Sequence, residues 1–170
     1  MRFLRFAATL IIGALLPFSS AFAFDHSKLS TLLGSTVSGG KVDYEAVRAK
    51  SADLNAYLAS IATASGTQSL GFYINAYNAL VLDALVDSGP ALPAKVTDLP
   101  GFFDAKKYTV AGKSVTLNEL ENGVRAQYKD ARIHFAFNCG AKSCPVLRST
   151  AWPEDEAALS KALDDATTSF

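Results

Sequence analysis

The segment from Leu70 to Val86 constrains the fold more than any other part of this sequence. Between these two positions the only strongly polar side chains belong to Asn75, Asn78 and Asp83. A helix that is apolar on nearly every side has to be surrounded by the rest of the chain. The segment therefore predicts a central, buried helix around which the other elements pack.

The two asparagines of this segment need partners if the helix is buried. Asn75 and Asn78 are three positions apart, so they are neighbours on one helix face. A buried amide without a hydrogen-bond partner costs about 1–3 kcal/mol. Two interpretations follow: the amides bond to a neighbouring loop or strand, or they line a ligand-binding site.

The first part of the sequence has the pattern of an export signal. Arg2 and Arg5 precede an apolar run from Phe6 to Phe18, and Ala21-Phe22-Ala23 matches the small residues before a signal-peptidase cut. The run is shorter than the about 20 residues that span a bilayer. We expect residues 1–23 to be a cleaved signal peptide and the mature protein to be periplasmic or secreted, with no integral membrane segment.

Charge and length limit what the mature chain, residues 24–170, can be. The full sequence has 16 Lys and Arg and 16 Asp and Glu, and without Arg2 and Arg5 the mature chain has 14 and 16, so there is no basic excess to hold a nucleic acid. Without a repeat or a low-complexity tract, this length fits one domain. We expect a single soluble domain that does not bind nucleic acid and whose partners the sequence leaves unknown.

Local patterns predict the other elements. Asp43 is placed to cap a helix that starts at Tyr44, and Thr116 with Glu119 forms a capping box at the start of another helix. That second helix carries Glu121 and Arg125 at a spacing that allows an ion pair. A further helix is expected from Pro153, where acidic residues follow the proline.

Two segments predict strands. Residues 107–110 and 113–115, joined by Ala111-Gly112, have the pattern of a hairpin. Residues 133–138 alternate between apolar and polar side chains. The expected fold class is α+β, a helix-rich single domain with a small, mostly antiparallel sheet that contains the hairpin and the 133–138 strand.

The only two cysteines follow the 133–138 segment, and unless they are two buried free thiols they allow three interpretations. Export favours a disulfide between Cys139 and Cys144, which would clamp the short loop between them. Alternatively Cys139 is a nucleophile, with His134 and Glu121 as the other catalytic candidates. In the third, His134, Cys139 and Cys144 bind zinc, although their spacing is not a common one. Apart from that zinc alternative, no metal or other cofactor is expected.

Four stretches carry a resemblance to a known family. VDYEAV at 42–47, FYINAYNALVL at 72–82, TLNELENGVR at 116–125 and RIHFAFNCGAKSCPVLR at 132–148 resemble the domain of unknown function 547 family, over residues 34–170. The positions that match its signature are Asn75, Asn78, Glu121, Arg125, His134, Cys139, Ser143, Cys144 and Pro145.

The resemblance implies export, since bacterial members are commonly exported, but it implies no activity. Members usually continue beyond the helix with which this sequence ends, so the C-terminal part of the domain is expected to be missing. The order of elements also invites a remote comparison with papain-like and transglutaminase-like hydrolases. Their nucleophilic cysteine begins a buried helix, whereas the corresponding helix here carries Asn75 and Asn78.

These observations favour a disulfide-clamped binding or accessory module of the cell envelope. In that interpretation Asn75, Asn78, Glu121 and His134 either hold the core together or contact a ligand, and Arg125 is a further ligand-binding candidate. The alternative functions are a cysteine-dependent hydrolase or transferase that uses Cys139 with His134, and the zinc site.

Overall fold

A computed structural model describes residues 23–89 and 91–170, so nearly all of the expected signal peptide, residues 1–23, lies outside the described residues. The α-helices and strands follow one another in the order α1 (Ser27–Thr36), β1 (Val37–Ser38), β2 (Lys41–Val42), α2 (Tyr44–Ala49), α3 (Ser51–Ala62), α4 (Leu70–Asp87), β3 (Tyr108–Val110), β4 (Lys113–Val115), α5 (Leu117–Tyr128) and α6 (Glu156–Ser169). Two 3₁₀ helices, η1 (Val96–Asp98) and η2 (Ala131–Phe135), lie in the connections.

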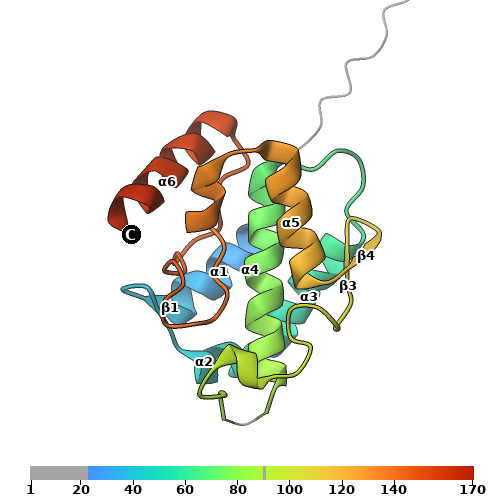
Figure 1. Ribbon diagram of the computed structural model, residues 1–170, viewed down its shortest axis with the longest axis vertical. Coiled ribbons are helices and arrows are strands. Elements are labelled where there is room, and N and C mark those ends of the chain that lie inside the picture. The colour runs from blue at the N-terminus through green and yellow to red at the C-terminus, as the bar shows by residue number, and fades with distance from the viewer. Residues whose placement is uncertain (1–22, 90) are drawn as a thin grey trace, which may run out of the picture.

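Helix α4 is the centre of the fold, as the sequence predicts. Figure 1 shows it running through the middle of the molecule, with α3 and α5 beside it and α1 behind. Its start is fixed by Ser69, whose hydroxyl accepts a hydrogen bond from the backbone N–H of Phe72 at 3.0 Å. Every residue from Ile74 to Leu82 is buried. Because α4 is apolar on all sides, it needs neighbours on all sides.

The elements before α4 form where local chemistry predicts them. The Asp43 carboxylate accepts a hydrogen bond from the backbone N–H of Ala46 at 3.0 Å and caps α2. The helix that starts at Tyr44 ends at Ala49, and α3 begins as a separate helix after Lys50. Gly39 and Gly40 supply the positive φ angles, 56° and 74°, that turn β1 back onto β2.

The expected α+β class is confirmed. Strands β3 and β4 pair antiparallel with Ala111 and Gly112 at the turn, and β1 and β2 make a second, separate antiparallel pair. The capping box at the start of α5 is also present. The Thr116 hydroxyl accepts from the Glu119 backbone N–H at 3.1 Å, and the Glu119 carboxylate accepts from that of Thr116 at 2.8 Å.

The strand predicted over residues 133–138 is wrong. Residues 131–135 form η2, which begins where the Asp130 carboxylate accepts a hydrogen bond from the Arg132 backbone N–H at 2.9 Å. Ile133, Ala136 and Phe137 are buried and His134 is exposed, which is the spacing of a helical turn. The small sheet therefore does not include this segment, and its polar groups bond to α4 instead.

Helix α6 begins three residues later than Pro153, at Glu156, because Asp155 caps it. The Asp155 carboxylate accepts from the backbone N–H of Ala158 at 2.8 Å. Arg132 on η2 holds this helix in place, because its Nη1 lies 2.7 Å from Oδ1 of Asp164 on α6.

Across residues 23–89 and 91–170, none of the helices combines the length and the apolar character needed to cross a membrane.

Candidate functional site

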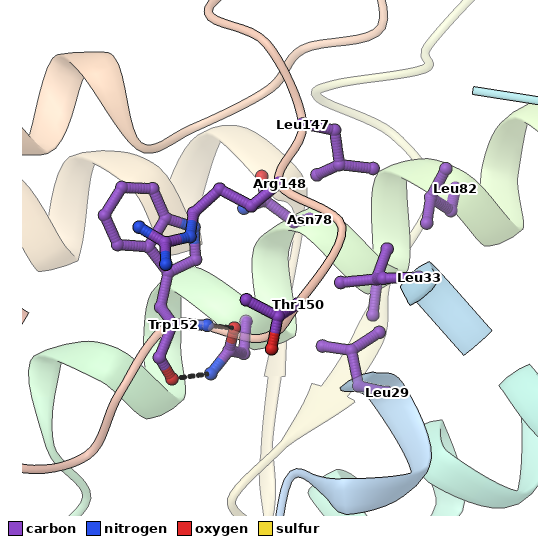
Figure 2. A pocket seen from close by; sticks show the side chains of 10 residues that line it. Leu29, Leu33, Asn78, Leu82, Leu147, Arg148, Thr150 and Trp152 are labelled. Carbon is purple, nitrogen blue, oxygen red and sulfur yellow. Dashed lines mark hydrogen bonds between the residues drawn. The ribbon is translucent and has the colours of Figure 1, made fainter. Parts of the chain in front are cut away.

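Asn75 bonds the middle of α4 to the segment that leads into α6. Its side-chain nitrogen donates to the backbone carbonyl of Trp152 at 2.9 Å, and its oxygen accepts from the Trp152 backbone N–H at 2.8 Å. The two dashed lines at Trp152 in Figure 2 mark these bonds. Both polar atoms of the amide are thus occupied by one backbone residue, as the loop-bonding interpretation expects.

Asn78 makes the same kind of attachment one turn further along. Its nitrogen donates to the Ala136 carbonyl at 3.0 Å, and its oxygen accepts from the Asn138 backbone N–H at 2.9 Å. Asn138 continues the chain of bonds: its oxygen accepts from the Gly140 N–H at 3.0 Å, and its nitrogen donates to the Pro145 carbonyl at 2.7 Å. We call residues 139–144 the cysteine loop. Asn78 holds Asn138 at its start, and Asn138 in turn holds Pro145 at its end.

The two amides face a closed space. Figure 2 shows this pocket between α1, α4 and the 147–152 segment, with Leu29, Leu33, Leu82 and Leu147 around it. It encloses no room for a molecule as large as water. Asn75 and Asn78 therefore hold two chain segments on α4, and no open cavity is lined by them at this place.

The cysteine loop is closed by a disulfide between Cys139 and Cys144, whose Cα atoms are 5.9 Å apart. Gly140 packs closely on α4, since a Cβ there would lie 2.7 Å from Leu85 Cδ1, and its φ of 80° favours glycine. The loop is thus held by a covalent bond, by Asn138 and by contact with the core. Both sulfurs are oxidised, so neither is a thiolate in this state.

Glu121, Arg125 and His134 come together on the surface, and we call them the surface triad. Arg125 Nη2 lies 2.7 Å from Glu121 Oε1 and 2.8 Å from His134 Nδ1. An arginine only donates hydrogen bonds, so Nδ1 of His134 is the acceptor and the ring proton sits on Nε2. The sequence predicted the ion pair of Glu121 with Arg125. It did not predict that η2 brings His134 to Arg125.

Tyr77 lies beside the triad and is not among the sequence-predicted site residues. Its side chain is fully buried, with its ring 4.6 Å from that of Phe137. Within the described ranges its hydroxyl makes no hydrogen bond of ordinary geometry, although the Glu121 carboxylate lies near it. Burial raises the pKa of Tyr77, and the nearby Glu121 carboxylate raises it further. The signal available in the sequence was a phenol placed between the two asparagines of a mostly apolar helix.

The other sequence-predicted candidates, His134, Cys139 and Cys144, take part in two separate contacts. The hydrogen bond recorded for His134 goes to Arg125, and the two sulfurs bond to each other. In the part of the chain that the structure describes, no group of three or more His, Cys, Asp or Glu side chains is placed to share a metal ion. Asn75 and Asn78 bond to backbone away from the triad.

A second polar cluster surrounds His26, and the sequence does not predict it. His26 Nδ1 lies 2.7 Å from the Tyr57 hydroxyl, and Nε2 lies 2.6 Å from Glu154 Oε1. The ring of His26 also packs against Phe24 and Phe72. Because His26 and Glu154 are 128 positions apart, no local pattern links them. This buried cluster attaches the residues just before α1 to the segment before α6.

The comparisons with known proteins identify a family and no activity. A family model described as "Protein of unknown function, DUF547" matches residues 61–170, which is more than half of the chain. The matched region begins later than the resemblance noted above and contains α4, the surface triad and the cysteine loop. No curated protein and no solved structure matches the chain.

Proposed function

The chain belongs to the DUF547 family of proteins of unknown function, and on that premise we propose that it is an exported protein that serves the cell envelope as a binding or accessory module. We assign its contact with a ligand to the surface triad of Glu121, Arg125 and His134. The observation that carries this proposal is the position of Arg125 Nη2, within 2.8 Å of both its partners.

The triad has the arrangement expected of a prepared contact site. Arg125 fixes the orientation of the His134 ring, and the ring presents its Nε2–H away from the arginine. Glu121 balances the charge of Arg125, with the two groups partly exposed at 23% and 40% of their side chains. Exposed ion pairs add about 0–1 kcal/mol to stability, so holding the fold together is a weak explanation for three such groups meeting here.

Two observations support export. The N-terminal sequence has the charged, apolar and small-residue regions of a cleaved signal. The disulfide between Cys139 and Cys144 is of a kind that persists in an oxidising compartment such as the periplasm. The clamped loop starts five positions after His134, and so belongs to the same segment as the triad.

The proposal can be tested without knowing the ligand. In a strain that carries this gene, the gene is deleted and the growth defect under envelope stress, such as detergent or osmotic shock, is measured. Arg125→Ala and His134→Ala are expected to fail to restore growth. The matched control is Lys161→Ala, which removes a similarly spaced exposed ion pair, to Asp165 on α6, and is expected to restore it.

Growth restored by Arg125→Ala to the level of the control would contradict the assignment of the triad. If Cys139→Ser abolished complementation while Cys144→Ser did not, the function would depend on Cys139 as a nucleophile and not on the disulfide clamp. Stoichiometric zinc in the purified protein would favour the site at His134, Cys139 and Cys144.

Export is tested on the same strain by intact mass. The exported protein is expected to begin at Phe24, to lack the two hydrogens of its thiols and to resist alkylation until it is reduced. A chain that retained residues 1–23 in the membrane fraction would contradict export by a cleaved signal. Rapid alkylation of one cysteine without reductant would support the cysteine-dependent hydrolase or transferase.

A further inference from the structure

An open groove lies between α6, η2 and the segment that follows the disulfide. Its volume is about 480 Å³. Its walls are mostly apolar and include Phe135, Pro145, Val146, Trp152 and Phe170. Val146, on one wall of the groove, is 64% exposed. Exposed apolar surface concentrated in one concave place is typical of a binding site.

Arg148 is the one cationic side chain that lines this groove. Its guanidinium lies over the Trp152 ring, 4.8 Å from the ring centroid, and Figure 2 shows the two side chains against each other. Its Nε is buried without a hydrogen-bond partner, and the ion pairs found among residues 23–89 and 91–170 do not include Arg148. Burial lowers the pKa of Arg148, and Asp165 opposes this shift.

The acidic side chain that lines the groove is already paired with another cation. Asp165 lines the groove, but its carboxylate lies 2.9 Å from the ammonium group of Lys161. A guanidinium binds a carboxylate strongly, because the two groups match in shape and charge. The half-buried guanidinium of Arg148 thus lies among mostly apolar walls without an ion-pair partner in the described part of the chain.

We propose that this groove binds a small amphipathic carboxylate, a molecule with one carboxylate group and an apolar tail. The carboxylate pairs with Arg148, and the tail covers Val146, Phe135 and Phe170. Each CH₂ group that leaves water contributes about 0.8 kcal/mol, so a tail of several carbons adds substantially to binding. This site is distinct from the surface triad and does not depend on the function proposed for it.

Decanoate is a suitable probe, and Trp152, which lines the groove, is the only tryptophan of the sequence, so the tryptophan fluorescence comes from this side chain. We expect decanoate, below its micelle concentration, to change this fluorescence saturably. Decanol, which lacks the charge, and acetate, which lacks the tail, should each bind at least about 10-fold more weakly, a difference of about 1.4 kcal/mol. Decyltrimethylammonium should not bind.

Variants separate the two parts of the site. Arg148→Gln should weaken decanoate binding at least about 10-fold, and Val146→Ser, at an exposed wall position, should weaken it while leaving the melting temperature unchanged. Arg125→Ala is the control and should bind decanoate like the original protein. The proposal is overturned if decanol binds as tightly as decanoate, or if folded Arg148→Gln keeps the original affinity. It is also overturned if the molar mass rises with protein concentration and decanoate does not reverse the rise, because a second copy then fills the groove.

Discussion

The side-chain oxygen of Asn78 accepts a hydrogen bond from the backbone N–H of Asn138 at 2.9 Å, across 60 positions of sequence. The nitrogen of the same amide donates to the Ala136 carbonyl at 3.0 Å. Asn78→Ala removes both bonds and leaves two backbone groups unpaired in a buried place. We expect it to lower the free energy of unfolding by about 2–4 kcal/mol, measured by urea denaturation.

Asn122→Ala is the matched control, because Asn122 is an exposed helical asparagine on α5. It should change the unfolding free energy by less than about 0.5 kcal/mol. If Asn78→Ala melted like the original protein, the amide would not be supporting the fold, and a direct role in binding would be favoured instead.

Two helical glycines should respond in opposite ways to the same substitution. A Cβ at Gly71 would collide with the backbone carbonyl oxygen of Pro153, so Gly71→Ala has to push the segment before α6 away from α4. We expect a loss of about 1–3 kcal/mol. At Gly123 on α5 a Cβ would meet nothing within 4 Å, and Gly123→Ala should gain about 1 kcal/mol from helix propensity. Thermal denaturation of both variants measures this, and equal shifts would contradict the close packing at Gly71.

Asp83 gives a pH dependence whose sign follows from its surroundings. Burial raises the pKa of its carboxyl, repulsion by Asp87 adds to the rise, and Lys106 opposes it. A carboxyl with a raised pKa in the folded protein destabilises the fold when it is ionised, so stability falls as the pH rises from the ordinary value through the raised one.

Asp83→Asn should therefore raise the melting temperature at pH 7, and the gain should vanish near pH 3, where the original side chain is protonated in both states. Asp104→Asn, at an exposed position, is the control and should change little. A gain that stayed constant between pH 3 and pH 7 would show that the carboxyl charge is not its cause.

The disulfide should stabilise the protein modestly, because it closes a short loop. In the chain-entropy model a loop of this size contributes about 2 kcal/mol. In urea denaturation, the double variant Cys139→Ser with Cys144→Ser should have a free energy of unfolding lower by about that amount. The original protein should show the same loss when reductant is present. No loss in either case would indicate that Asn138 and the packing of Gly140 are enough to hold the loop.

The sequence predicted the elements that local chemistry determines. The apolar run of α4, the Asp43 cap, the β3–β4 hairpin and the capping box of Thr116 with Glu119 each depend on residues a few positions apart. Residues 133–138 were predicted wrongly because six alternating positions do not distinguish a strand from a turn. Their conformation depends on Asn78, which takes the backbone groups that a strand would have paired.

The site was predictable only within one helix. Glu121 and Arg125 are four positions apart, so their ion pair follows from helix geometry. His134 reaches them only because η2 turns the chain, and the pair of His26 with Glu154 depends on the whole fold. The exposed groove beside Arg148 likewise combines residues from three separate segments.

Arg125 holds His134 in one orientation, with Nδ1 as acceptor and the proton on Nε2. Nitrogen-15 NMR of the imidazole at pH 8 tests it most directly, since the two ring nitrogens have distinct shifts in each tautomer. We predict the Nε2–H form for His134 and a mixture of tautomers in Arg125→Ala, with Lys161→Ala unchanged. A proton on Nδ1, or identical spectra for the original protein and Arg125→Ala, would contradict the account.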